Sequence, residues 1–422
     1  MDKIRVGVIG ASRGLSMVNY CLKADNAQVV AICEKRKELI EDIRRQMEGL
    51  PVTFYEDYDE FLTHDMDAVV LANYAHQHAP FAVKAMKAGK HVISEVLPCQ
   101  TMKEAVELVE AVEETGKIYC YAENYCYMRA PYEMHCLYKE GKIGEIEYAE
   151  GEYLHNCETI WPDITYGEPD HWRNRLYSTF YCTHSLGPLL FICGLRPVSV
   201  TGFELPYGER CARVGRRGGA AGIEMVTLEN GAILKSIHGG LMRDSIWYTV
   251  YGKKGNLESA RETAENGAYG RLYLKAYRES GDYEHYEKTT YEPEWKKDER
   301  VKEFGHGGSD YVCMWNCFEK MRGNPEAETV DVYMALDMSL PGIFAYRSIL
   351  AGNKPMLVPN LRNKEERDAW RNDVACTDPD VAGDSLLPCN AQGDPEIEPE
   401  VYELVRKKWE EKGKRNQYKV NK

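Results

Sequence analysis

The start of the chain constrains its fold most strongly, because it reads as a strand, a glycine turn and a helix in that order. Residues 4–9 form an apolar run, residues 10–14 supply the turn, and the chain can be helical from about Ser16. Such a turn lets backbone N–H groups and the positive end of a helix dipole meet a pyrophosphate. A second apolar strand, residues 29–33, ends at Glu34, where dinucleotide sites place a carboxylate for the ribose hydroxyls. The pattern predicts a Rossmann-type domain.

The turn departs from the usual Gly-x-Gly-x-x-Gly pattern. Ser12 stands where the second glycine belongs, and Gly14 comes one place early. The turn alone therefore fits a cofactor loop and an ordinary strand–helix connection equally well. Glu34 favours NAD because a carboxylate repels a 2′-phosphate, but the basic run 35–37 follows at once and leaves NADP open.

The predicted secondary structure changes near residue 122. Before it, strands at 68–72, 91–94 and 118–122 alternate with helices at 80–88 and 101–116, the second opened by a Thr101/Glu104 capping box. After it, tyrosine-rich and β-branched segments alternate with turns, which is typical of a mostly antiparallel sheet. We expect an α/β protein with a Rossmann NAD-binding domain at 1–122, an α+β substrate domain with a large open, mostly antiparallel sheet at 123–375, and a C-terminal arm and helix at 376–422.

Length and charge narrow the function classes. A chain of 422 residues exceeds what one hydrophobic core usually serves, and a net charge of −14 argues against nucleic acid or an anionic membrane as partner. There is no apolar run near the ~20 residues of a membrane helix and no signal-peptide core, so we expect a cytoplasmic protein. None of the 14 cysteines forms a Cys-x-x-Cys pair, which predicts reduced thiols and no metal site.

Tyr181 and His184 stand three residues apart, just before Gly187-Pro188, which we interpret as a break in the chain's regular structure. Imidazole changes charge near neutral pH, so His184 is a candidate for proton transfer. An unperturbed phenol, with a pKa of about 10, is a poor base at neutral pH, so Tyr181 would need the charge of a nearby nicotinamide or of a cationic histidine to act as one. The plainer alternatives are a half-buried sheet tyrosine and a histidine that caps a helix.

Several dispersed motifs carry a resemblance to a known family. Residues 88–95, Ala-Gly-Lys-His-Val-Ile-Ser-Glu, together with the dinucleotide domain and the open sheet, resemble the Gfo/Idh/MocA oxidoreductases across roughly residues 3–360. Most members continue Glu-Lys-Pro, whereas this chain reads Glu95-Val96-Leu97-Pro98, and valine cannot transfer a proton. In this it is similar to the NAD-dependent α-N-acetylgalactosaminidases and related glycosidases, which also lack the lysine. Further matches to that subgroup lie at 122–125, 143–145, 153–155, 181–188, 305–310 and 331–333.

The resemblance implies glycoside cleavage through a redox cycle. NAD⁺ would take a hydride from C3 of the sugar, a base would remove the acidified C2 proton, the C1 substituent would leave, water would add, and the hydride would return. The resemblance implies that Tyr181, as the C2 base, and His184 are catalytic, and that the sugar is bound by Glu123, Tyr153, His155 and His306. The predicted cofactor-binding residues are Gly10, Ser12, Arg13, Gly14, Glu34, Asn73, His78, Glu95 and Asn124.

One departure limits the choice of substrate. The galactosaminidases carry Arg-Pro-Tyr where this chain has Met242-Arg243-Asp244, so a tyrosine that contacts the sugar is missing. We therefore expect a small related glycoside, not specifically N-acetylgalactosamine, and a homo-oligomer formed through the C-terminal sheet. Three functions stay open: an NAD-dependent glycosidase, a sugar dehydrogenase or 3-ketosugar reductase without glycosidic cleavage, and a cofactor-bound regulatory protein without turnover.

Overall fold

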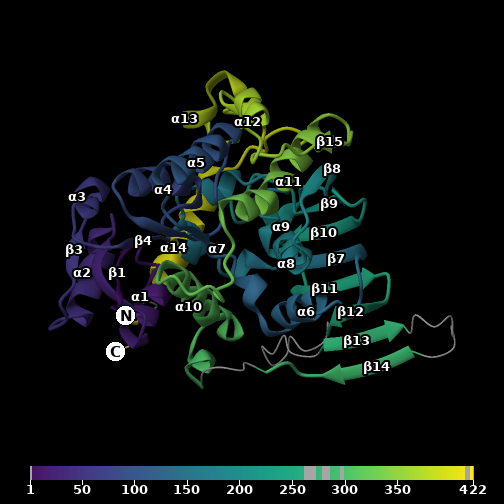
Figure 1. Cartoon of the computed structure of the whole chain (residues 1–422). Helices are drawn as coiled ribbons and strands as arrows, with labels where there is room; N and C mark the ends of the chain where they lie inside the picture. The colour runs from purple at the N-terminus through teal and green to yellow at the C-terminus, as the bar shows by residue number, and fades with distance from the viewer. Residues whose placement is uncertain (1, 261–271, 278–285, 295–298, 414–418, 422) are drawn as a thin grey trace.

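The computed structural model describes residues 2–260, 272–277, 286–294, 299–413 and 419–421 (Figure 1). Two β-sheets organise the chain, each in its own domain, and helices fill the space between them. This is the predicted α/β fold class, with a Rossmann domain followed by a domain built on a larger sheet.

The N-terminal sheet is parallel throughout, with strand order β3-β2-β1-β4-β5-β6. Its strands are β1 (Ile4–Ile9), β2 (Ala27–Cys33), β3 (Thr53–Tyr55), β4 (Ala68–Leu71), β5 (His91–Ser94) and β6 (Tyr119–Tyr121). Its helices are α1 (Leu15–Lys23), α2 (Lys37–Gln46), α3 (Tyr58–Leu62), α4 (His78–Lys87) and α5 (Met102–Thr115). The strand order reverses between β1 and β4, and ligands of such sheets bind at the carboxyl ends of the strands at this switch point.

The predicted capping box at the start of α5 is present. Thr101 Oγ1 accepts a hydrogen bond from the Glu104 N–H at 3.1 Å, and Glu104 Oε2 accepts from the N–H of Gln100 at 2.7 Å. The helix ends at Gly116, whose φ of 62° is left-handed and therefore favours glycine.

The C-terminal sheet has nine strands in the order β14-β13-β12-β11-β7-β10-β9-β8-β15. Only β7 and β10 pair in parallel, so the mostly antiparallel sheet expected from the sequence is confirmed. The strands are β7 (Ile146–Leu154), β8 (Pro197–Glu204), β9 (Ala221–Leu228), β10 (Ile233–Gly239), β11 (Ser245–Gly252), β12 (Gly255–Ser259), β13 (Leu272–Tyr277), β14 (Tyr286–Tyr291) and β15 (Met356–Leu357).

Helices cover the face of this sheet that turns toward the Rossmann domain (Figure 1). Helix α8 (Thr183–Cys193) packs on β7, β10 and β11, with α6 (Arg129–Lys139) beside it, and α11 (Val332–Leu350) packs on β8 and against α5. Helix α10 (Ser309–Met321) contacts α1, so the chain returns to the Rossmann domain after the sheet. Helix α8 thus lies between the sheet and the carboxyl ends of the Rossmann strands.

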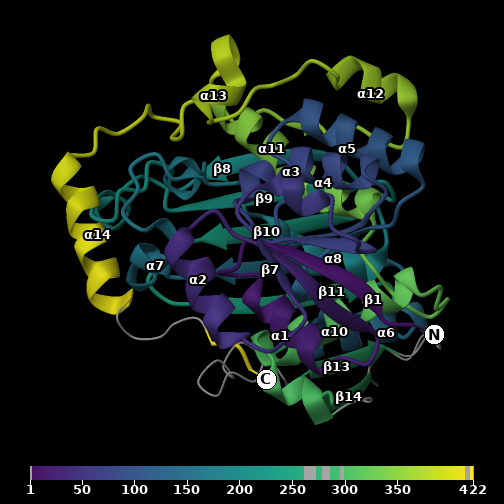
Figure 2. The same ribbon diagram turned by 90° about the vertical axis from the view of Figure 1, so that its left-hand side faces the viewer.

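Residues 364–413 form an arm that runs around the outside of the molecule (Figure 2). It contains α12 (Lys364–Trp370), α13 (Pro379–Ala382) and α14 (Pro399–Gly413), and α14 packs on the short helix α7 (Trp161–Thr165). Lys412 Nζ reaches Asp163 Oδ2 at 3.1 Å, and the Trp409 and Tyr166 rings meet at 5.4 Å between centroids. The segment Asp163–Tyr166, which this contact supports, also lines the cavity described next.

Candidate active site

A cavity of about 390 Å³ lies at the carboxyl ends of β1, β2 and β4. Of the predicted cofactor residues, it is lined by Gly10, Ser12, Arg13, Glu34 and Asn73. Gly10 has a φ of +87°, and a Cβ there would stand 2.3 Å from the Ala72 carbonyl oxygen, so only glycine fits. Ser12 is not among the residues with positive φ, so it replaces the usual second glycine without backbone strain.

Glu34 ends β2 with its carboxylate turned toward the glycine turn. The side chain is buried, Oε2 accepts from the N–H of Ala11 at 2.8 Å, and Oε1 accepts from the N–H of Arg36 at 2.9 Å. A carboxylate has about four acceptor positions, so it can still accept from ribose hydroxyls. Of the three basic side chains that left NADP open, Lys35 lies 4.1 Å from the Tyr74 centroid and Arg36 4.4 Å from that of Tyr166, and Lys37 Nζ lies 3.7 Å from Glu56 Oε2. The residues present therefore fit NAD.

Gly14 and His78 position the segments around this cavity. A Cβ on Gly14 would stand 2.6 Å from the Gly10 carbonyl oxygen, so this glycine lets α1 approach β1 closely. The buried His78 ring lies between the carbonyl oxygens of Leu97, 2.8 Å from Nδ1, and Asn73, 3.2 Å from Nε2. Burial lowers the pKa of His78 to about 4, so the ring is neutral and its single N–H can donate to only one of these two carbonyls.

Arg13 and Asn124 meet at Asp310, at the start of α10, and Arg13 links Glu95 to this residue. Arg13 Nε donates to Glu95 Oε1 at 2.8 Å, and its Nη1 donates to Asp310 Oδ2 at 3.1 Å. Asn124 Nδ2 donates to Asp310 Oδ1 at 2.7 Å, and His306 Nδ1 lies 3.0 Å from the same oxygen. Burial opposes ionisation of Asp310, but the Arg13 charge and the His306 contact hold its pKa well below the usual range. This network joins the glycine turn to the C-terminal domain.

The four predicted sugar-site residues Glu123, Tyr153, Tyr181 and His184 come together although they lie on different elements. Glu123 follows β6, Tyr153 lies on β7, and Tyr181 and His184 flank the start of α8. Glu123 Oε1 lies 2.6 Å from His184 Nδ1, and both side chains are buried. The rings of Tyr125, Tyr153 and Tyr181 surround the imidazole at 4.0, 4.7 and 5.2 Å between centroids. Within the described residues, Glu123 Oε2 has no hydrogen-bond partner, although it is buried.

Helix α8 is not broken at Gly187-Pro188, contrary to the interpretation drawn from the sequence. Pro188 lies inside the helix and has no N–H for the His184 carbonyl four residues earlier. That carbonyl instead accepts the Tyr248 hydroxyl of β11 at 2.5 Å. Gly151 of β7 completes the fit, because a Cβ there would stand 2.0 Å from the Ser185 carbonyl oxygen. The sheet therefore sets the position of His184.

His155 and His306 lie at the edge of the same cluster. The Tyr153 hydroxyl lies 3.1 Å from His155 Nδ1, and burial lowers the pKa of His155, while Asp244 opposes the shift. The His306 ring is 6.1 Å from that of Tyr125, and its side chain is 40% exposed. Both histidines can therefore reach a ligand that enters beside Tyr125 and Tyr153.

The geometry adds Arg173, which the sequence analysis did not single out. Its guanidinium carbon lies 4.4 Å from the Trp172 ring centroid and 5.8 Å from that of Tyr181, and Arg173 also lines the cofactor cavity. Burial raises the pKa of Tyr181 to about 12, and the Arg173 charge opposes that rise. Tyr181 therefore holds its proton at neutral pH before a ligand binds. Arg173 thus places a positive charge near Tyr181 that the sequence analysis, which named only the nicotinamide and a histidine, did not expect.

The 14 cysteines are free thiols, in agreement with the sequence. A search of the described part of the chain finds no group of three or more His, Cys, Asp or Glu side chains that could hold a metal ion. Within the same residues, no helix is both long and apolar enough to cross a bilayer.

Comparisons with known proteins find a family match in each domain. Residues 4–123 match the oxidoreductase family with an NAD-binding Rossmann fold (Gfo/Idh/MocA), and residues 245–368 match the glycosyl hydrolase 109 C-terminal domain. Over these two segments the chain is similar to a Gfo/Idh/MocA NAD-binding domain and to a glycosyl hydrolase 109 C-terminal domain, which confirms the resemblance inferred from its motifs. The chain is an enzyme with an NAD-binding domain.

Similar proteins agree with this assignment. A glycosyl hydrolase family 109 protein of Shewanella sp. (strain W3-18-1) is 25% identical over 412 residues, which cover 88% of this chain and 87% of the relative. An α-N-acetylgalactosaminidase of Shewanella oneidensis is 25% identical over 408 residues, with the same shares of each chain. Among solved structures, levoglucosan dehydrogenase in complex with NADH and L-sorbose has a TM-score of 0.67 at 18% identity and covers 85% of this chain and 100% of its own. At that identity the likeness shows the fold alone.

Proposed function

We propose that the chain cleaves glycosides by transient oxidation of the sugar at C3, followed by loss of the C2 proton and of the C1 substituent. The observation that carries the proposal is the buried Glu123–His184 pair, enclosed by tyrosines. Val96, which stands where most members of the family have a lysine, cannot transfer a proton. His184 is therefore the group that takes the proton of the C3 hydroxyl.

Glu123 and His184 have distinct tasks in this scheme. Glu123 Oε1, 2.6 Å from Nδ1, orients the ring so that Nε2 faces away from the carboxylate, and its negative charge stabilises the imidazolium that forms. Glu123 Oε2, which no described residue contacts by a hydrogen bond, can accept from a second sugar hydroxyl. Bound NAD would supply the hydride acceptor at C3 and return the hydride at the end, so no net oxidation results.

The second half of the scheme needs a base at C2, and we assign it to Tyr181. A ketone at C3 acidifies the C2–H, and Tyr181 lies 5.2 Å from His184, between centroids, and next to Arg173. The raised pKa of Tyr181 means that phenolate formation depends on positive charge brought close to it. Arg173 and an imidazolium at His184 both supply such charge once the first proton has moved. Tyr181→Phe should retain oxidation at C3 and lose exchange of the C2 proton, and unchanged exchange would remove this assignment.

The second candidate is a sugar dehydrogenase or 3-ketosugar reductase without glycosidic cleavage. The same Glu123–His184 pair would serve it, and the raised pKa of Tyr181 favours it, because it needs no base at C2. A cytoplasmic location and assembly through the nine-stranded sheet belong to either proposal and stay predictions from the sequence. The sugar is left open, because Met242-Arg243-Asp244 replaces a segment that contacts sugar in the resembling galactosaminidases.

The test is incubation with a panel of α- and β-p-nitrophenyl glycosides, with and without prior removal of the cofactor. Nitrophenol release and absorbance at 340 nm are followed together. The proposal predicts release that requires NAD and leaves no net NADH. Stoichiometric NADH from free sugars with no release from any glycoside would replace it by the dehydrogenase.

A further inference from the structure

Arg216 carries a positive charge without an acidic partner at the edge of the sugar-site cluster. Its Nε is buried and has no hydrogen-bond partner, and among the described residues no carboxylate forms an ion pair with its guanidinium. Removing a charge from water costs free energy, so buried charges in proteins are normally paired. An unpaired guanidinium of this kind is suited to bind an anion that arrives with a ligand.

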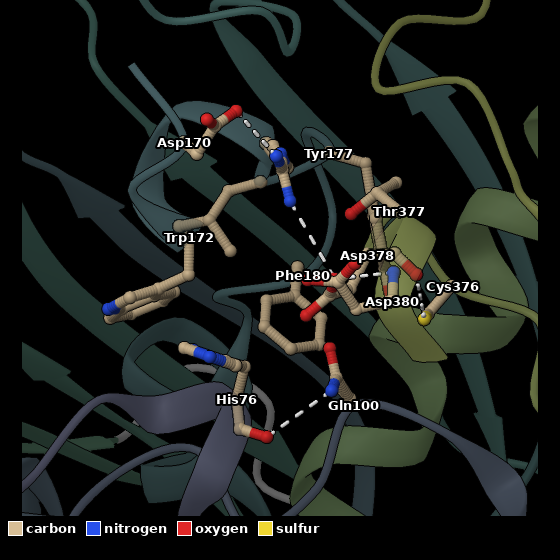
Figure 3. Close-up of a pocket in the computed structure, with 12 residues that line it drawn as sticks. His76, Gln100, Asp170, Trp172, Tyr177, Phe180, Cys376, Thr377, Asp378 and Asp380 are labelled. Carbon is tan, nitrogen blue, oxygen red and sulfur yellow. Dashed lines mark hydrogen bonds and ion pairs between the residues drawn. The ribbon is translucent and has the colours of Figure 1, made fainter. Parts of the chain in front are cut away.

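Other arginines in this part of the chain are paired with carboxylates. Arg213 Nη2 donates to Glu158 Oε2 at 2.8 Å. Arg175 Nη2 donates to Asp170 Oδ1 at 2.7 Å, beside a separate cavity of about 300 Å³ (Figure 3). Within the part of the chain that the structure describes, Arg216 has no such carboxylate to neutralise it.

The turn that carries Arg216 is held in place on both sides. The N–H of Arg217 donates to the Asn174 carbonyl oxygen at 2.8 Å. Gly215 has a φ of +79°, and a Cβ there would stand 2.4 Å from the Tyr402 ring of α14, so only glycine fits. The Tyr402 hydroxyl donates to the Gly215 carbonyl oxygen at 3.2 Å. The backbone of Arg216 is thus positioned before any ligand binds.

The guanidinium lies beside the strand ends that carry sugar-site residues. Arg216 Nη1 is 3.4 Å from the point that a Cβ on Gly240 would occupy, and the His155 carbonyl oxygen is 3.7 Å from the same point. Gly240 follows β10, in which His238 pairs with Tyr153 of β7, so these two side chains point to the same face of the sheet. Arg216 therefore lies at the His155 edge of the cluster.

The histidines at this edge add no charge at neutral pH. Burial lowers the pKa of His238 to about 3, and the Arg216 charge is the next largest cause of this shift. Burial also lowers the pKa of His155. Both imidazoles are therefore neutral at pH 7, and the positive charge at this edge comes from arginine.

Two arginines and one carboxylate act on the segment that follows β7. Burial raises the pKa of the Cys157 thiol, and the charges of Arg173 and Arg216 both oppose that rise. The Asp244 charge raises the same pKa, and Asp244 Oδ1 accepts from the N–H of Asn156 at 2.5 Å. Two guanidinium groups against one carboxylate leave a net positive charge beside the sugar site, which favours a ligand with an anionic group.

We propose that Arg216 binds an anionic group on the sugar ring and that the substrate is an acidic glycoside, a hexuronide. This inference rests on the proposed glycosidase function. That chemistry uses C1, C2 and C3, so the anionic group belongs to one of the remaining carbons, as the C6 carboxylate of a hexuronic acid does. The planar fork of a guanidinium matches the two oxygens of a carboxylate. Arg216 thereby determines specificity without taking part in the proton transfers.

The experiment compares three p-nitrophenyl substrates of the same ring configuration: the hexuronide, the neutral hexoside and the hexoside 6-sulfate. The readout is the ratio of kcat/KM for hexuronide over neutral hexoside, because a general loss of catalysis cancels from it. The wild type should prefer the hexuronide. Arg216→Gln should reduce the ratio by about tenfold, equivalent to about 1.4 kcal/mol. Arg216→Lys, which keeps the charge but loses the fork, should reduce it less.

Arg217 provides the matched control. It is the next residue, is half-buried like Arg216, and its charge acts on Cys389 of the arm. Arg217→Gln should leave the ratio within about twofold of wild type. A second readout needs no turnover: calorimetric titration of the NAD-loaded protein with free hexuronate and free hexose. The wild type should bind hexuronate more tightly, and Arg216→Gln should remove the difference.

The outcomes separate this inference from the function on which it rests. Faster cleavage of the neutral hexoside by the wild type, or a ratio that Arg216→Gln leaves unchanged, would remove the inference and retain the glycosidase. An equal loss in Arg217→Gln would show a structural effect and overturn the role of Arg216. Preference for the 6-sulfate would support an anionic substrate and overturn the choice of a carboxylate. Hexuronate binding that depends on Arg216, with no glycoside cleaved, would remove the glycosidase and retain the anion site.

Discussion

Replacement of Glu123 by glutamine tests the role of the buried pair directly. Glutamine keeps the size of the side chain and can still accept from His184 Nδ1 through its amide oxygen, but it cannot stabilise an imidazolium by charge. The contact it replaces is 2.6 Å long, and both side chains are buried. A hydrogen bond to a charged group contributes about 1.5–3 kcal/mol, and about 1.36 kcal/mol is a factor of ten in rate. We therefore expect kcat/KM to fall about 10- to 150-fold.

The free energy of unfolding of the Glu123→Gln variant should stay close to that of the wild type. The substitution removes a buried charge whose Oε2 has no hydrogen-bond partner among the described residues, so the free energy of unfolding should change by less than about 1 kcal/mol. Kinetics on the glycoside found by the panel and urea denaturation followed by circular dichroism measure the two quantities. Loss of activity that merely follows loss of the fold would point to a structural role.

Glu224 of β9 provides the matched control. It is as fully buried as Glu123, and burial raises its pKa to about 8, so the carboxyl is neutral at pH 7. Glu224→Gln replaces one neutral group by another at a residue that contacts Ser236 and Cys182 but not the Glu123–His184 pair, and kcat/KM should stay within about twofold of wild type. The reasoning is refuted if Glu123→Gln retains activity within about threefold, or if both variants lose activity equally.

Three further predictions concern the supports of the site. Tyr248→Phe leaves the His184 carbonyl buried without a donor, so the free energy of unfolding in urea should fall by about 1–3 kcal/mol, and an unchanged value would show that another donor takes over. Arg13→Gln removes the charge between Glu95 and Asp310 and should weaken NAD binding about tenfold in calorimetric titration of apoprotein, whereas equal affinity would exclude Arg13 from the cofactor site. The carboxyl pKa of Glu224 rises from 4.5 to about 8 on folding, so wild-type stability falls as pH rises through this range. Glu224→Gln should therefore gain in melting temperature over wild type between pH 5 and pH 8, and a constant difference would contradict the shift.

The sequence predicted those features of the fold that depend on local pattern. The alternation of strands and helices to residue 122, the capping box at Thr101 and the antiparallel texture of the second sheet are each set by neighbouring residues. Neighbouring residues alone could not predict that α8 continues through Pro188. This continuation depends on a hydroxyl from Tyr248, 64 residues from His184, and on the absence of a side chain at Gly151.

The residues of the candidate site were likewise predicted only where they belong to a sequence motif. The resemblance named Glu123, Tyr153, Tyr181 and His184, and the fold brings them together. Arg173 was missed because it belongs to no motif used in the comparison, and only the approach of its segment to Tyr181 gives it a role.

Two other residues illustrate what motifs leave out. Asp310 stood inside the quoted motif at 305–310, yet its link to Arg13, 297 residues away, follows only from the fold. His78 was assigned to the cofactor, but its ring lies between two backbone carbonyls, a placement that no local pattern signals.

Deuterium at C2 of the released sugar is the most direct test of the central claim, that cleavage proceeds through a C3 ketone with proton abstraction at C2. A glycoside that the enzyme cleaves is incubated to completion in D₂O, and the product is examined by NMR and mass spectrometry. The account predicts one deuterium at C2, with no net NADH. Complete cleavage with hydrogen retained at C2 would contradict it, because direct displacement at C1 never breaks that bond.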